Sequence, residues 1–121
     1  MRDAFAEIER GHEAKYKLGQ ELIFKAQCRR NKLLGAWAAE QMGLNRAEGE
    51  AYARMLVSLN MEQPGVGRVL ARVVEDFRRR GVRKGEDDVK AALQKFYTEA
   101  LESLAREFPK ALGPDHVRVG D

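Results

Sequence analysis

The sequence predicts an all-α protein, a four-helix bundle whose first helix is long and has a mobile N-terminal part. Apolar residues recur at helical spacing in four blocks, and no run shows the alternation of a β-strand. Glycine and proline separate the blocks at Gly43, at Pro64-Gly65, between residues 81 and 85, and at Pro109. With 121 residues the chain has the size of one domain.

The first block spans about residues 3–42 and divides near Leu18. From Leu18 onward, helical spacing predicts a core-facing surface. Its members are Leu18, Leu22, Ile23, Ala26, Leu33, Leu34, Trp37, Ala38 and Met42. Before Leu18, large apolar side chains are few and charged ones are many, and an isolated helix of this length is marginal in water. We therefore expect residues 1–17 to be mobile, with Gly19 weakening the junction.

The second and third blocks carry start and stop signals of their own. Asn45 is a predicted N-cap for a helix over residues 46–60, and Glu48 completes a capping-box pattern. Pro64 suits the first turn of the third helix, and Gly81 suits its C-terminal end. The predicted core residues are Tyr52, Met55, Leu56 and Leu59 in the second block and Val66, Val69, Leu70, Val73 and Phe77 in the third.

The fourth block spans about residues 87–108 and ends at Pro109. Acidic residues crowd its start, where negative charge complements the helix dipole. The predicted inner surface comprises Val89, Leu93, Phe96, Ala100, Leu104 and Phe108, with Tyr97 and Leu101 alongside. Residues 109–121 lack an apolar period and are expected to be a flexible tail. The predicted domain organisation is thus a mobile segment (1–17), a helical bundle (18–108) and a tail.

Composition and charge argue against several classes of protein. The 22 Lys and Arg residues against 19 Asp and Glu give a net charge of +3, a small excess for a nucleic-acid binder. We expect neither a signal peptide nor a membrane span, because no apolar run approaches the roughly 20 residues that a bilayer requires. The single cysteine, Cys28, has no disulfide partner in the chain and indicates a reducing compartment, the cytoplasm.

No catalytic or metal-binding pattern stands out in the sequence. His12, His116 and Cys28 lack the spacing of a zinc site. Ser58 and Ser103 fall on predicted helices without a nearby histidine to activate them. We therefore expect no enzyme, no metal and no cofactor.

Two basic clusters keep an alternative open, a small helical module that binds nucleic acid or nucleotides. The clusters are Arg78, Arg79 and Arg80 with Arg83 and Lys84, and Arg29 and Arg30 with Lys32. Either could contact phosphate. No aromatic side chain is interleaved with them to stack on bases, so surface charge is the simpler interpretation and no nucleic-acid partner is expected.

The residues before Leu18 form a charged, amphipathic segment with few apolar partners in the chain. A frayed terminus and a segment that folds into a groove on a partner explain this pattern about equally. In the second case Phe5, Ile8 and Tyr16 are the apolar anchors.

Two stretches of the sequence favour the partner-binding segment over the frayed terminus. Residues 9–16 read Glu-Arg-Gly-His-Glu-Ala-Lys-Tyr, and residues 29–39 read Arg-Arg-Asn-Lys-Leu-Leu-Gly-Ala-Trp-Ala-Ala, the more specific of the two. Together they resemble the alphaproteobacterial zeta subunit, an inhibitor of the F1Fo ATP synthase. The resemblance covers about residues 5–108 and is strongest in the first 43. The chain departs from it at residues 17–21, where members usually carry a His-Asp pair and further acidic residues.

The resemblance implies a four-helix bundle with a mobile N-terminal segment that inhibits ATP hydrolysis. The segment would become helical in a catalytic interface between the alpha and beta subunits of F1, against gamma, as the unrelated mitochondrial ATPase inhibitor protein does. It would block rotation in the hydrolysis direction and be expelled by rotation in the synthesis direction.

On this resemblance the partner-binding residues lie between residues 5 and 16. They are Phe5, Ile8 and Tyr16 as anchors and Glu9, Arg10, His12, Glu13 and Lys15 as polar contacts. The expected location is the cytoplasm, peripheral to the inner membrane through F1Fo. Weak binding of adenine nucleotides is expected of some members, and the sequence locates no site for it.

Overall fold

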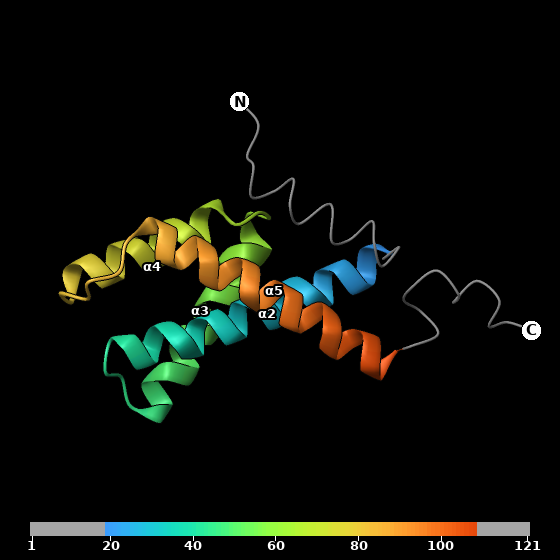
Figure 1. The fold of residues 1–121 in the computed structure, drawn as a ribbon, viewed down its shortest axis with the longest axis horizontal. Helices are drawn as coiled ribbons and strands as arrows, with labels where there is room; N and C mark the ends of the chain where they lie inside the picture. Colours follow the sequence, from blue (N-terminus) through green and yellow to red (C-terminus); the bar gives the residue numbers. More distant parts are fainter. Residues whose placement is uncertain (1–18, 109–121) are drawn as a thin grey trace, which may run out of the picture.

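The structure, a computed structural model, describes residues 19–108, and this part of the chain contains four α-helices and no strand (Figure 1). The helices are α2 (Gln20–Gln41), α3 (Arg46–Glu62), α4 (Gly67–Arg79) and α5 (Glu86–Glu107). The all-α prediction with four helical blocks is therefore confirmed. The expected mobile segment, residues 1–17, and the expected tail, residues 109–121, lie outside the described residues.

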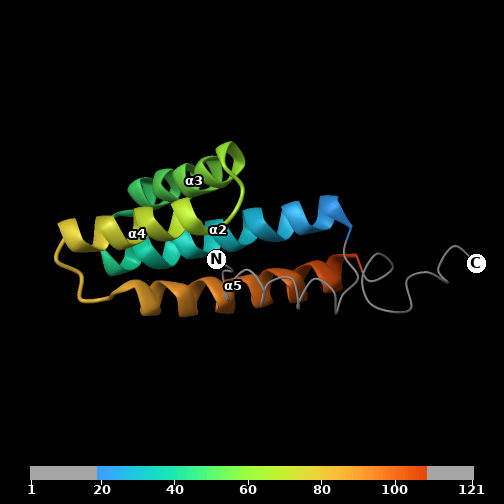
Figure 2. The ribbon, with the colours of Figure 1, turned by 90° about the horizontal axis from the view of Figure 1, so that it is seen from above.

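Helix α2 is the centre of the bundle. It packs against α3 on one side and α5 on another, while α4 contacts both α3 and α5. Figure 2 shows α2 between α3 and α5, with both long helices extending past α3 and α4. The described chain thus starts and finishes on the two helices that project furthest from the rest.

Local signals in the sequence position the helix ends. Asn45 Oδ1 accepts a hydrogen bond from the Glu48 backbone N–H at 2.8 Å, and Glu48 Oε1 accepts one from the Asn45 N–H at 2.9 Å, which confirms the capping box. Helices α2 and α4 end in Schellman motifs, with Gly43 at φ +72° and Gly81 at φ +71°.

The predicted start of α4 at Pro64 is wrong by three residues. Gly65 adopts φ +113°, a left-handed value that a right-handed helix cannot contain. Pro64 therefore belongs to the preceding turn, and the helix begins at Gly67 with Val66 as its N-cap residue.

The larger core cluster lies where all four helices meet. Its fully buried members include Leu34 from α2, Leu56 from α3, Phe77 from α4 and Leu93 from α5. The Trp37 ring makes edge-to-face contacts with Phe77 and Phe96, with centroids 5.6 and 6.4 Å apart. These contacts hold α2 against α4 and α5.

Two residues that the sequence assigns to the core lie at its edge. Leu33 is 37% exposed because the buried side of α2 follows Ala26, Leu34 and Ala38 and so passes beside it. Phe108 is 39% exposed because α5 ends at Glu107, which leaves Phe108 off the helical surface.

Candidate functional site

All eight residues predicted to bind a partner lie before residue 19, outside the described residues. The described part shows how the chain that follows them is held. Gly19 has extended backbone (φ −82°, ψ 170°), and its carbonyl accepts a hydrogen bond from the Ile23 N–H at 3.0 Å. A Cβ added at Gly19 would meet no atom within 4 Å, so neither conformation nor space requires glycine there.

Among the described residues, the apolar side chains in the first turns of α2 pack on the end of α5. A second core cluster joins these two helices, and α3 and α4 contribute no residue to it. Its members are Ala26, Tyr97, Ala100, Leu101 and Leu104, with Leu22 and Ala105 packed against them. We call this part, residues 20–30 of α2 with residues 97–107 of α5, the two-helix section (Figure 1).

An ion pair joins α2 to α5 on the solvent-facing side of the two-helix section. Arg29 of α2 donates hydrogen bonds to both carboxylate oxygens of Glu107 at 2.5 and 2.6 Å and to the Ser103 hydroxyl. The guanidinium lowers the pKa of Glu107, and the carboxylate raises the pKa of Arg29. The bidentate geometry fixes the orientation of α2 on α5 close to the point where residues 1–18 join.

A buried polar layer separates the two core clusters. Arg30, Asn31 and Asn60 are 1%, 0% and 3% exposed. The Arg30 guanidinium lies 5.5 Å from the centre of the Tyr97 ring and donates to Asn31 Oδ1 at 3.1 Å and Asn60 Oδ1 at 3.4 Å. The Nδ2 of Asn31 has no hydrogen-bond partner among the described residues.

The prediction of a surface cluster at Arg29, Arg30 and Lys32 is therefore wrong for Arg30. Arg30 lies on the i, i+4 row that runs from Ala26 to Leu34, and this row is the buried side of α2. That spacing was the signal in the sequence. With Arg29 paired to Glu107, only Lys32 of the three is an exposed cation without a carboxylate partner among the described residues.

The most specific stretch of the resemblance is a structural element. Arg30 and Asn31 form the polar layer, and Leu34, Ala38 and Ala39 are buried, from 0% to 4% exposed. Gly35 allows α2 to approach α3, because an added Cβ would lie 2.5 Å from Ala53 Cα. These residues form part of the core and of the contact between α2 and α3.

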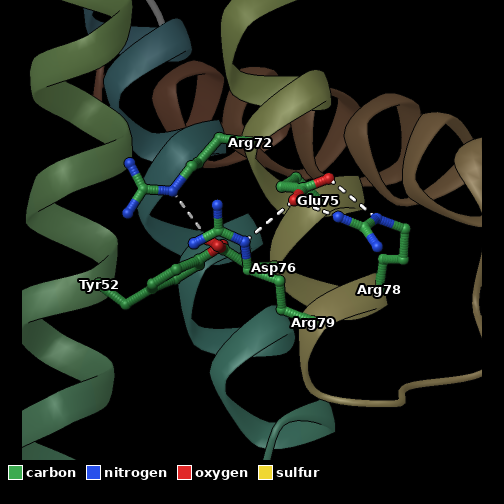
Figure 3. Close-up of polar contacts among 6 residues, drawn as sticks. All are labelled: Tyr52, Arg72, Glu75, Asp76, Arg78 and Arg79. Atoms are coloured by element: carbon green, nitrogen blue, oxygen red, sulfur yellow. Dashed lines mark hydrogen bonds and ion pairs between the residues drawn. The ribbon is translucent and has the colours of Figure 1, made fainter.

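A second polar network joins α3 to α4 (Figure 3). Tyr52 donates its hydroxyl to Asp76 at 2.7 Å, and Arg72 donates to the same carboxylate at 2.9 Å. Burial, followed by the hydrogen bond to Asp76, raises the pKa of Tyr52. Glu75, the residue before Asp76 on α4, accepts hydrogen bonds from Arg78 and Arg79, and this lowers the pKa of Glu75 to about 2.

Two grooves flank the exposed side of α2. One, of about 700 Å³ between α2 and α3, is lined by small residues such as Ala36, Ala39 and Gly49. The other, of about 390 Å³, lies between α2 and α5, and Lys32 lines both. No group of three or more metal-ligating side chains occurs within residues 19–108, and none of the four helices has the length and hydropathy to cross a membrane.

A comparison with protein families identifies the chain. The family model "ATPase inhibitor subunit zeta" matches residues 1–103, which include all eight predicted partner-binding residues and the helices from α2 into α5. The chain belongs to this family. A comparison with curated proteins finds no match. As a zeta-family member the chain is a regulatory subunit that inhibits an ATPase, and an inhibitor of this kind binds the ATPase that it regulates.

Proposed function

We propose that this zeta-family member blocks ATP hydrolysis by inserting residues 1–17, as a helix, into an alpha/beta catalytic interface of F1, against gamma. The observation that carries the proposal is the family match, which begins at residue 1 and so includes this segment. The anchors are Phe5, Ile8 and Tyr16. The polar contacts at the edge of the interface are Glu9, Arg10, His12, Glu13 and Lys15.

The energetics of this mode are feasible. Ordering a segment on binding costs roughly 2–5 kcal/mol. Burying each of three large apolar side chains contributes roughly 1.5–3 kcal/mol, which together offsets that cost. The bundle is a suitable carrier, because its core is already buried and α2 begins immediately after the segment. We place the complex in the cytoplasm, peripheral to the inner membrane through F1Fo. The free thiol of Cys28 suits that compartment.

The test is inhibition of ATP hydrolysis by F1 from the organism that encodes this chain. Replacing Phe5, Ile8 and Tyr16 together by alanine is expected to raise the half-inhibitory concentration roughly 100-fold or more, since a loss of about 2.7 kcal/mol has that effect. The matched control replaces Asp3 and Glu7 by alanine. A helical projection puts these two residues opposite the anchors, so the control is expected to inhibit normally.

A photoreactive residue at position 8 tests the location of the segment. Cross-links to alpha or beta during hydrolysis support the proposal. Full inhibition by the anchor variant, or cross-links to neither subunit, would contradict the insertion mechanism.

Weak adenine nucleotide binding is a second candidate, favoured by the 700 Å³ groove between α2 and α3. Small residues form its walls. Its charged lining comprises the cations Lys32, Arg46 and Arg54 and the carboxylates Glu40 and Glu50, of which Glu50 pairs with Arg46. Calorimetry with ATP and ADP tests this candidate. We expect weak binding that Lys32→Glu and Arg54→Glu abolish together, and the absence of heat with either nucleotide would remove the candidate.

A further inference from the structure

Positive charge is concentrated on α4 and the turn that follows it. Residues 67–85 carry a net charge of +5, against +3 for the whole chain, so the remaining residues sum to −2. The cations are Arg68, Arg72, Arg78, Arg79, Arg80, Arg83 and Lys84. Because Val69, Val73 and Phe77 bury the apolar side of α4 in the core, the charge belongs to its outer side.

Local ion pairs engage four of these cations. Arg68 pairs with Glu62, Arg72 with Asp76, and both Arg78 and Arg79 with Glu75. The other three, Arg80, Arg83 and Lys84, pair with no carboxylate of the described residues. We call these three the basic corner.

Three acidic residues, Glu86, Asp87 and Asp88, follow the basic corner, and none of them forms an ion pair with it within the described residues. Glu86 pairs with Lys90 at 2.9 Å, and Asp88 accepts a hydrogen bond from the Gly85 N–H at 2.9 Å. Arg80 and Arg83 are exposed and Lys84 is half-exposed, so the basic corner faces solvent. Three neighbouring cations thus remain available to an external acidic group.

The backbone of the basic corner is held at both ends. At the end of α4, the Val82 N–H donates to the Phe77 carbonyl at 2.9 Å, and the Val82 side chain packs against the larger core cluster. At the start of α5, the capping contact between Gly85 and Asp88 fixes the chain. Binding through a backbone that is already ordered forfeits little conformational entropy.

We propose that the basic corner binds an acidic surface of the F1 assembly and gives the bundle a second contact in addition to residues 1–17. This inference rests on the proposed function. The turn between α4 and α5, which contains the basic corner, lies at the opposite end of the bundle from the start of α2 (Figure 1), and α2, with 22 residues, is about 33 Å long. Two linked contacts make the second binding event intramolecular, and charge complementarity accelerates the encounter.

The structure favours a protein partner over a membrane or a nucleic acid. The exposed large apolar residues of the described chain, Phe24, Leu33, Met61 and Phe108, all lie on other elements. The basic corner therefore presents no large exposed apolar side chain to a bilayer and no aromatic ring to a base. Its chemistry matches a carboxylate-rich protein surface.

The experiment measures the rate at which the full chain associates with immobilised F1, at low salt and near 0.15 M salt, alongside inhibition of hydrolysis. The variant carries Arg80→Glu, Arg83→Glu and Lys84→Glu. The matched control carries Lys25→Glu, Lys95→Glu and Arg106→Glu, three exposed cations on α2 and α5 with the same total change of charge. Thermal melts establish that both variants are folded.

We expect the corner variant to associate about tenfold more slowly at low salt and to lose most of the salt dependence, while the control changes less than about threefold. Equal effects of the two variants, or no effect of the first, would overturn the inference and leave the proposed function intact. Corner-dependent binding to anionic lipid vesicles with unchanged association to F1 would also overturn it. A wild-type chain that binds F1 through the basic corner without inhibiting hydrolysis would instead refute the proposed function alone.

Discussion

Substitution of Gly35 by alanine tests the packing of α2 against α3. An alanine Cβ would lie 2.5 Å from Ala53 Cα, 2.7 Å from Ala53 Cβ and 3.1 Å from Ala53 N. Two of these atoms are backbone, so no side-chain rotation relieves the clash. Restoring ordinary contact requires the two helices to separate by about 1 Å, in an interior that is otherwise close-packed.

The magnitude follows from two opposing effects. Overpacking of a core costs typically 1–3 kcal/mol, and the higher helix propensity of alanine returns about 1 kcal/mol. The difference is a loss of roughly 0–2 kcal/mol, and we expect the upper half of this range, roughly 1–2 kcal/mol, because backbone must move. For a domain of this size that lowers the melting temperature by roughly 5–15 °C.

Thermal and urea unfolding followed by circular dichroism measure this loss. Gly67→Ala is the matched control, because it also lies in a helix and an added Cβ there meets no atom within 4 Å. The control is expected to be as stable as the wild type or slightly more so. If Gly35→Ala were as stable as Gly67→Ala, the close approach of α2 and α3 would be refuted.

Three further predictions concern the polar groups. Arg30→Ala is expected to destabilise the fold by roughly 2–4 kcal/mol, whereas Lys32→Ala, two residues away and exposed, stays within about 0.5 kcal/mol; equal urea midpoints would contradict the buried polar layer. Tyr52→Phe removes the hydrogen bond to Asp76 and is expected to lower the free energy of unfolding by about 1–2 kcal/mol. Because the pKa of Tyr52 is raised, ultraviolet titration of this variant should show one tyrosine fewer that stays protonated at high pH. An unchanged titration would contradict the Tyr52–Asp76 contact. Because the pKa of Glu75 falls from 4.5 to about 2 in the folded state, its contribution to stability is complete above pH 4.5 and is lost as the pH falls toward 2. The stability difference between wild type and Glu75→Gln should therefore shrink over that interval, and a difference that stayed constant would show that Glu75 is not paired with Arg78 and Arg79.

The sequence predicts the helices well because their signals are local. The capping box at Asn45 and the stops at Gly43 and Gly81 require only neighbouring residues, and all three are present in the structure. The start of α4 was misplaced because the left-handed backbone of Gly65 competes with the preference of Pro64 for a first turn.

Burial is harder to predict, because it depends on which side of each helix meets a partner. Periodicity predicts Leu33 in the core and the charge of Arg30 predicts that residue on the surface, and the structure reverses both. Residue type outweighed position in that inference, since arginine is rarely buried unless its guanidinium has partners. The partners Tyr97 and Asn60 come from other helices, so the sequence around Arg30 does not reveal them.

The parts of the candidate site also differ in how far the sequence predicts them. Residues 29–39 are the most specific part of the resemblance, and they contribute to the core and to contacts between helices. Their sequence pattern therefore reflects the fold. The eight partner-binding residues stay a prediction from the pattern of residues 5–16 and the resemblance. Packing within the described chain does not test this prediction, because the proposed role depends on a second protein.

A titration of F1 with the full chain and with a version that lacks residues 1–17 tests most directly whether this segment blocks ATP hydrolysis. Circular dichroism must show that the truncated version keeps the helical bundle. We expect the full chain to inhibit ATP hydrolysis and the folded, truncated bundle to leave it unchanged. Inhibition by the truncated bundle with undiminished potency would contradict the claim that residues 1–17 block the enzyme.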